Sequence, residues 1–155
     1  MHMHLYPKPM SKAALSAPSR CTCLRIRKAA RRISQIYDGH LGPTGLTITQ
    51  FGLLAHVKRL DGIGIGALAD ELIMDPTTLT RNLRPLERRR LIAIEPDPRD
   101  RRSRRLRLTG EGREALEKAR PAWARAQREI EAVLGAPEAG ALNDTLDAAL
   151  ERLAR

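Results

Sequence analysis

Residues 64–108 read GIGALADELIMDPTTLTRNLRPLERRRLIAIEPDPRDRRSRRLRL, and this stretch decides the fold. Its first half predicts two helices, because apolar residues recur there at helical spacing. The inward residues of the two helices are Ile65, Leu68, Ala69 and Leu72, then Leu79, Leu83 and Leu86. Asp75-Pro76 separates them and starts the second helix, since Asp caps a first turn and Pro is preset for its first position.

After Arg90 the apolar pattern changes from helical spacing to alternation. Residues 91–95 and 104–108 therefore predict two strands, and the polar segment 96–103 predicts the turn between them. Two short helices followed by a hairpin is the element order of a winged helix-turn-helix. We expect a mainly α fold with a small β-hairpin wing.

Amphipathic helices are predicted on both sides of this lobe, over 24–41 and through most of 110–155. Thr47 and Gln50 have the spacing of a capping box at the start of a further helix. Long amphipathic helices in so small a chain have too little partner surface in one copy, so we expect a twofold homodimer. The expected organisation is a disordered arm (1–19), a helical dimerisation region (20–46 and 110–155) and a winged helix-turn-helix DNA-binding lobe (47–109).

The charge of the chain favours a polyanionic partner. Its 155 residues hold 28 Lys and Arg against 18 Asp and Glu, a net charge of +10. Residues 81–107 contain eleven Arg and four acids, whereas 111–155 contain seven bases and nine acids. Such a concentrated basic segment indicates contact with double-stranded DNA. No window resembles a membrane helix or secretory signal, so we expect no membrane partner and a cytoplasmic location.

Two segments supply the candidate DNA contacts. In a helix-turn-helix, the N-terminal residues of the second helix enter the major groove. They are Pro76, Thr77, Thr78, Thr80, Arg81 and Arg84. In the hairpin tip, interspersed acids can orient the arginines for a narrow minor groove. The tip candidates are Asp100, Arg101, Arg102 and Arg104.

Four motifs in this order resemble the MarR family of bacterial regulators. They are Asp75-Pro76-Thr77-Thr78-Leu79-Thr80-Arg81, Leu86-Glu87-Arg88-Arg89-Arg90-Leu91-Ile92, Asp97-Pro98-Arg99-Asp100-Arg101-Arg102 and Leu108-Thr109. The resemblance implies an obligate homodimer that usually represses transcription and leaves DNA when a small phenolic or lipophilic molecule binds. It also implies that Arg102 enters the minor groove with Asp100 as its orienting partner. Family members often have Gly where this chain has Ile73 and Arg90, so a left-handed backbone there would be strained.

Two sets of residues are candidates for a switch. Cys21 and Cys23 lie among arginines that would favour thiolate, which suggests an oxidant sensor; the alternative is two small residues at a helix start. A zinc site that adds His40 and His56 to the cysteines matches no closed motif. The aromatic candidates for an effector pocket are Tyr37, His40, Phe51 and Trp123, although aromatic residues on apolar stripes usually belong to the core.

No catalytic or cofactor-binding motif occurs, so we expect neither an enzyme nor a cofactor or metal requirement. The expected function is a sequence-specific regulator, more often a repressor, that binds a pseudo-palindromic operator as a homodimer and is released by a small-molecule or oxidant signal. The alternative is a basic nucleic-acid-packaging protein that ignores sequence. RNA binding is disfavoured because aromatic residues make up only 3% of the chain.

Overall fold

The computed structural model describes residues 20–154, so the arm expected over 1–19 lies outside the described residues. The chain divides into two compact units, one up to Ile33 and one from Ser34, and each is described by itself. The first helix, α1 (Thr22–Leu41), contributes to both units. It begins just after Cys21, whose carbonyl accepts a hydrogen bond from the Arg25 backbone N–H at 3.2 Å.

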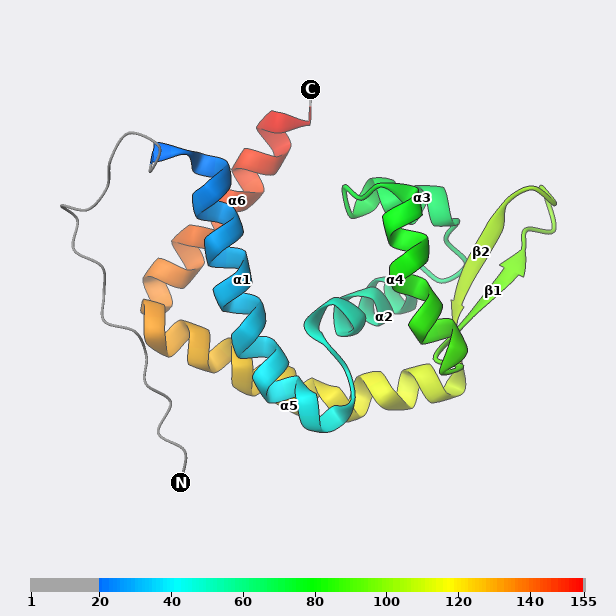
Figure 1. The fold of residues 1–155 in the computed structure, drawn as a ribbon, viewed down its shortest axis with the longest axis horizontal. Coiled ribbons are helices and arrows are strands. Elements are labelled where there is room, and N and C mark those ends of the chain that lie inside the picture. Colours follow the sequence, from blue (N-terminus) through cyan, green and yellow to red (C-terminus); the bar gives the residue numbers. More distant parts are fainter. Residues whose placement is uncertain (1–19, 155) are drawn as a thin grey trace. The chain divides into compact units, whose positions relative to one another are not determined.

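The second unit holds the remaining elements in the expected order (Figure 1). After α1 come a short 3-10 turn η3 (Gly42–Thr44), α2 (Ile48–Arg59), α3 (Ile65–Glu71), α4 (Pro76–Arg88), β1 (Ile92–Pro96), β2 (Arg104–Leu108), α5 (Gly110–Leu134) and α6 (Ala136–Leu153). The expected fold class, mainly helical with a small hairpin, is confirmed.

Local capping chemistry sets the start of three helices. Thr47 and Gln50 form the predicted capping box at the start of α2. Asp75 caps α4 by accepting the Thr78 N–H at 3.0 Å. Thr109 caps α5 by accepting the Gly112 N–H at 2.9 Å. Each cap satisfies a backbone donor that has no partner inside its helix.

The hairpin is antiparallel and its register places apolar residues on one face. Ile92 pairs with Leu108 and Ile94 with Leu106, and of these four residues Ile94 is half-buried and the others are buried. The loop after α2 extends along the free edge of β2, since Ile63 and Gly62 exchange backbone hydrogen bonds with Leu106 at 2.9 and 3.0 Å. β2 is therefore hydrogen-bonded on both of its edges, to β1 and to this loop.

The core of the lobe lies between α2, α4, the hairpin and the first half of α5. Leu79, Leu83 and Leu86 of α4 are all fully buried in it, as their spacing predicts. On α2, Leu53 is buried, whereas Phe51 is half-buried. Phe51 instead stacks on Trp123, with ring centroids 6.0 Å apart.

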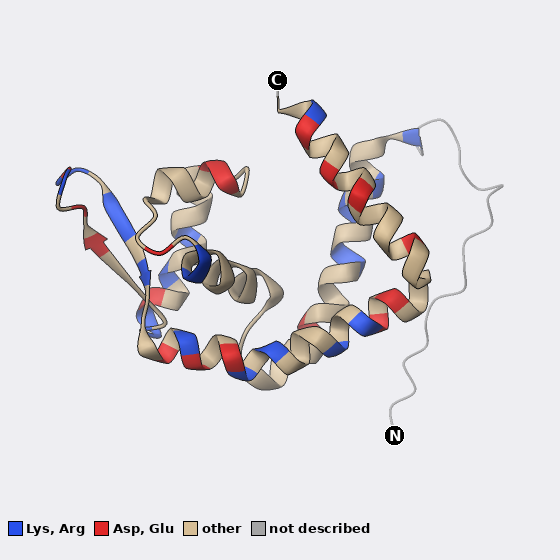
Figure 2. Ribbon diagram, turned by 180° about the vertical axis from the view of Figure 1, so that it is seen from behind, with Lys and Arg blue, Asp and Glu red and all other residues tan. Residues whose placement is uncertain are grey.

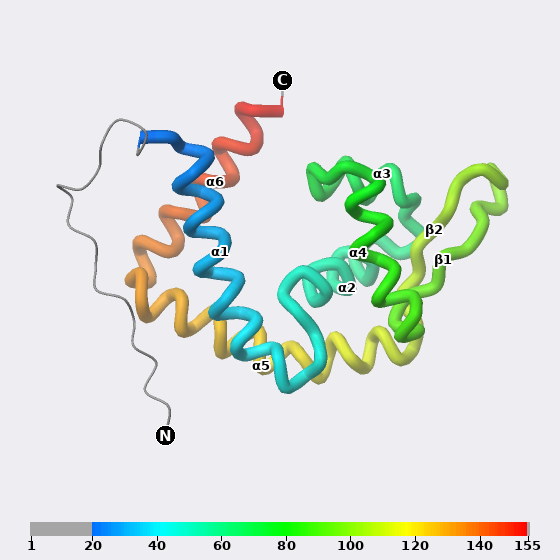
Figure 3. The backbone as a smooth tube through the Cα atoms, viewed as in Figure 1, coloured from blue at the N-terminus to red at the C-terminus, as the bar shows by residue number. Residues whose placement is uncertain are grey.

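The long helix α5 continues without interruption through Pro121, and the chain turns at Gly135 into α6 (Figure 3). Gly135 has φ of 92°, a conformation that favours glycine. Helix α6 leaves apolar side chains exposed, namely Leu142, Leu150 and Leu153. Within residues 20–154, no helix has both the length and the apolar character needed to cross a bilayer.

Candidate DNA interface

The first turn of α4 projects small hydroxyl-bearing side chains into solvent. Pro76, Thr77 and Thr78 are exposed. The Thr78 N–H is held by the Asp75 carboxylate, and the Thr80 hydroxyl donates to the Pro76 carbonyl at 2.8 Å. Thr80 is therefore already engaged within the helix, whereas Thr77 is the more available for an outside partner.

One face of α4 carries exposed cations. Arg81 and Arg84 follow Thr77 by four and seven residues, which places all three on one side of the helix. This side lies opposite the buried leucines. Among residues 20–154, no ion pair with an acid is found for Arg81 or Arg84. A neighbour on the same face, Arg88, was not singled out from the sequence, although its spacing of seven residues from Arg81 could have identified it.

The tip of the hairpin is ordered by its two aspartates. The Asp97 carboxylate accepts the Arg99 backbone N–H at 2.9 Å and pairs with the Arg105 guanidinium at 3.0 Å. The hydrogen bond from Arg99 and the charge of Arg105 hold the pKa of Asp97 below its usual range. The contact with Arg99 stabilises the start of the turn. The contact with Arg105 joins the two sides of the hairpin at the base of the tip.

Asp100 contacts Arg102 through the backbone of the tip. Its carboxylate accepts the backbone N–H of Arg102 and the hydroxyl of Ser103, each at 3.0 Å. Among the described residues, no ion pair joins Asp100 to the Arg102 guanidinium. Asp100 thus sets the backbone conformation of the tip, and the exposed side chain of Arg102 projects from that turn.

The other tip cations are also exposed, including Arg101 and Arg104, whereas Arg105 is held by Asp97. Figure 2 shows Lys and Arg along the hairpin and on α4, while Asp and Glu are frequent along α5 and α6. The lobe therefore presents a cationic helix face and a cationic loop, a combination suited to phosphate oxygens and base edges.

The four residues expected to form an effector pocket lie on α1, α2 and α5 within the second unit. Trp123 stacks with both Phe51 and Tyr37, and the Tyr37 ring centroid is 6.4 Å from that of Trp123. Tyr37 donates a hydrogen bond to Gln127, and burial raises the pKa of its hydroxyl, as does the charge of Glu131. His40 contacts Glu129 at 2.6 Å.

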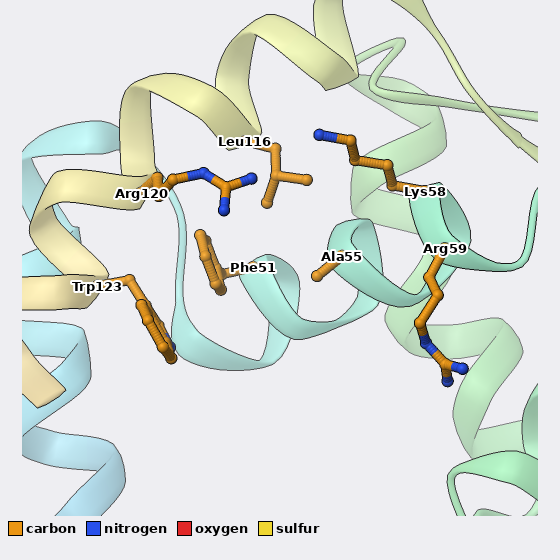
Figure 4. Close-up of a pocket in the computed structure, with 7 residues that line it drawn as sticks. All are labelled: Phe51, Ala55, Lys58, Arg59, Leu116, Arg120 and Trp123. Atoms are coloured by element: carbon orange, nitrogen blue, oxygen red, sulfur yellow. The ribbon is translucent and has the colours of Figure 1, made fainter.

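An open cleft of about 400 Å³ lies beside this aromatic stack (Figure 4). Phe51 and Trp123 line it, but Tyr37 and His40 do not. Its lining is completed by residues that the sequence did not point to, namely Ala55, Lys58, Arg59, Leu116 and Arg120. These residues come from α2 and α5, which are distant in sequence, so no local pattern could have grouped them.

The two cysteines are free thiols and exposed. Within residues 20–154, no group of three or more His, Cys, Asp or Glu side chains is arranged to hold a metal ion.

Comparison with known proteins gives a consistent result. Residues 44–103 match the model of the MarR family. The chain is 30% identical over 103 residues to the uncharacterised HTH-type transcriptional regulator YdgJ of Bacillus subtilis, which covers 66% of this chain and 63% of YdgJ. It is 37% identical over 76 residues to the transcriptional activatory protein BadR of Rhodopseudomonas palustris, which covers 47% of this chain and 43% of BadR. The aligned region is thus less than two thirds of either relative.

Similarity to a solved structure extends further along the chain. The transcriptional regulator MosR of M. tuberculosis, crystallised in complex with DNA, is 37% identical and superposes with a TM-score of 0.74, covering 88% of this chain and all of that one (100%). The family model, the relatives and the superposed structure all point to a helix-turn-helix transcriptional regulator. The chain therefore belongs to the MarR family of transcriptional regulators.

Proposed function

We propose that this protein is a homodimeric, sequence-specific regulator that binds a pseudo-palindromic operator in double-stranded DNA and represses transcription from it. The observation that carries the proposal is the pairing, within one lobe, of the exposed Thr77–Arg81 face of α4 with the arginine-rich tip of the hairpin. An α-helix fits the major groove, and an arginine loop fits the adjacent narrow minor groove. The related MosR was crystallised in complex with DNA, which supports DNA as the partner.

The proposed contacts divide between the two grooves. Major-groove contacts come from Pro76, Thr77, Thr78, Thr80, Arg81 and Arg84, and minor-groove and phosphate contacts from Arg101, Arg102 and Arg104, with Asp100 holding the tip. Residues 47–109 serve as the DNA-binding lobe in this proposal. Arg88 joins the set because it shares the exposed face of α4.

The dimer is proposed to form through residues 20–46 and 110–155. Leu142, Leu150 and Leu153 of α6 are exposed in the single chain, and Leu153 retains 79% of its surface. Three exposed leucines on one helix favour burial of that helix against another copy of the chain. Two lobes held in this way would read two half-sites about one helical turn apart.

Selection of bound sequences from a random DNA pool tests this proposal. A regulator should recover one palindrome and prefer it over random duplex by roughly a thousandfold or more at fixed salt. A packaging protein, the second candidate, would bind every duplex with similar affinity. Recovery of no common sequence would therefore refute operator recognition and favour packaging.

Repression is the proposed outcome of binding, although the related BadR is named as an activator. Transcription in vitro from a promoter that carries the selected palindrome decides between the two. Added protein should lower the transcript yield; a rise would reverse this part of the proposal. Such a regulator would work in the cytoplasm, where it meets its DNA.

Release from DNA is proposed to follow a small-molecule or oxidant signal. The cleft beside Phe51 and Trp123 supports a small phenolic or lipophilic effector, since the aromatic and aliphatic side chains of its floor bind such molecules. The exposed thiols of Cys21 and Cys23 support an oxidant signal. Peroxide should then abolish operator binding by the wild type and leave a Cys21→Ser/Cys23→Ser variant bound. An equal response of both proteins would rule out the thiol switch.

A further inference from the structure

The cleft between α2 and α5 has cationic walls around an apolar floor. Among the residues that the structure describes, seven line the cleft, three of them are cations and none is acidic. Figure 4 shows the side chains of Arg120 and Lys58 extending toward one another on either side of Leu116, above the Phe51 ring. Arg59 points away from them and pairs with Glu71 of α3 at 2.6 Å.

A single carboxylate holds the two converging cations. Glu117 Oε1 lies 2.7 Å from Lys58 Nζ and 3.0 Å from the Arg120 guanidinium, and Glu117 Oε2 accepts a second bond from Arg120 Nε at 3.1 Å. Glu117 is not among the lining residues, so it binds the cations from outside the cleft. It lies 59 residues from Lys58 and therefore joins α2 to α5.

We propose that Glu117 sets the charge selectivity of this cleft, as an internal carboxylate that competes with a planar anionic ligand for Lys58 and Arg120. The inference rests on the proposed effector function of the cleft. A flat ring would lie against the Phe51 and Trp123 side chains, while its carboxylate would meet the two cations. With Glu117 present, each cation already has one anionic partner, which weakens its attraction for a second.

The competition follows from charge balance at the mouth of the cleft. Removing the Glu117 charge leaves Lys58 and Arg120 without an anion on their outer side, so a ligand carboxylate becomes their main partner. Since paired charges near a surface interact modestly, we expect a gain of about three- to tenfold in affinity for the anion. A neutral ligand of the same shape should gain nothing.

The test compares Glu117→Gln with Glu114→Gln in the full chain. Glu114 is one turn earlier on α5 and pairs with Lys118, so its substitution removes the same charge without touching Lys58 or Arg120. The probes are benzoate and its neutral isostere benzamide. Binding is followed through the indole N–H resonance of Trp123, the chain's single tryptophan, which lines the cleft. Operator affinity is measured on the same samples.

The expected result is that Glu117→Gln binds benzoate about three- to tenfold more tightly than the wild type, while Glu114→Gln and all benzamide affinities stay unchanged. Equal gains for both variants, equal gains for both probes, or weaker benzoate binding by Glu117→Gln would overturn the inference. If neither probe shifts the Trp123 resonance in any protein, the inference fails together with the effector role of the cleft. Operator binding in those samples would still leave the DNA-binding proposal standing.

Discussion

Two residues adopt a backbone conformation that their side chains disfavour. Ile73 has φ of 51° and Arg90 has φ of 59°, and they are the two positions where the sequence suggested that glycine would be needed. Each lies just beyond the end of a helix, Ile73 after α3 and Arg90 after α4. The turn after α3 is closed by a hydrogen bond from the Met74 backbone N–H to the Ala69 carbonyl at 2.8 Å. A left-handed residue costs about 1–2 kcal/mol when it is not glycine. The helix-turn-helix therefore keeps its geometry at the expense of stability.

Replacing Ile73 by glycine should stabilise the lobe. Ile73 is 75% exposed, so the substitution removes little buried surface. Relief of the left-handed strain should outweigh the extra chain entropy of glycine and raise the free energy of unfolding by about 0.5–1 kcal/mol. Urea unfolding measures this change. Ile73→Ala is the matched control, because it removes the same side chain but keeps the Cβ; if both variants gain equally, strain is not the cause.

The ion pairs of Glu117 should make the stability of the folded protein depend on pH. Hydrogen bonds from Arg120 and Lys58 lower its pKa from 4.5 to about 2. A lowered folded-state pKa means that the stabilisation is complete above the unfolded value and is lost as pH falls through the folded value. The stability difference between wild type and Glu117→Gln should therefore shrink as pH falls from about 4.5 toward 2. A difference that stays constant over this window would contradict the ion pairs.

At the scale of elements, α5 meets the hairpin through a glycine. A Cβ added at Gly112 would lie 1.9 Å from the Leu91 carbonyl oxygen and 2.8 Å from Leu108 Cδ1. The Leu91 carbonyl also accepts the Thr109 N–H at 3.2 Å, so it cannot move without breaking the start of α5. The first turn of α5 thus lies directly against the start of β1, which fixes the base of the hairpin.

Gly112→Ala should destabilise the protein by about 1–3 kcal/mol, since the clash is with backbone. Thermal unfolding followed by circular dichroism measures it. Gly110→Ala is the control, because nothing lies within 4 Å of a Cβ there, and it should leave the protein unchanged or slightly more stable. A Gly112→Ala protein as stable as that control would show that the helix and strand are not in close contact.

Much of this architecture could be predicted from sequence because its signals are local. The caps at Thr47, Asp75 and Thr109 depend on residues within three positions, and the hairpin depends on alternation. The rest depends on tertiary contacts. Whether Leu53 or Phe51 is buried depends on where α5 lies, and the partner of Asp100 depends on how the tip folds back.

The candidate site shows the same division. The exposed face of α4 follows from helical spacing, so Thr77, Arg81 and Arg84 could be proposed from sequence alone. The cleft could not, because Lys58 and Glu117 meet only after α2 and α5 have packed together.

For the whole molecule, charge is distributed according to element. The net charge of +10 is concentrated outside the C-terminal helices, since residues 111–155 are nearly neutral. A cationic lobe next to a near-neutral helical segment allows attraction to DNA without strong repulsion between two copies of α5 and α6. It also predicts that operator binding weakens steeply with salt, because each phosphate contact releases counterions.

Two alanine substitutions should separate the two kinds of DNA contact. Arg102→Ala should weaken binding and reduce the slope of log affinity against log salt by about one unit, because the minor groove loses one cation. Arg81→Ala should leave most of that slope intact and relax the preference at one base pair of each half-site, a loss of about 1–3 kcal/mol for the preferred base. Fluorescence anisotropy at several salt concentrations, with the selected operator and with single-base variants, measures both effects.

The two outcomes differ because a guanidinium in the minor groove mainly meets the electronegative potential of that groove, whereas one at a major-groove base edge distinguishes that base. Lys118→Ala serves as the control, since it also removes one exposed cation but lies on α5, outside the proposed contacts, and loses only its ion pair with Glu114. Unchanged affinity of Arg102→Ala at physiological salt would refute the placement of the hairpin tip on DNA. Unchanged base preference of Arg81→Ala would place that side chain on the backbone and leave base reading to Thr77, Arg84 or Arg88.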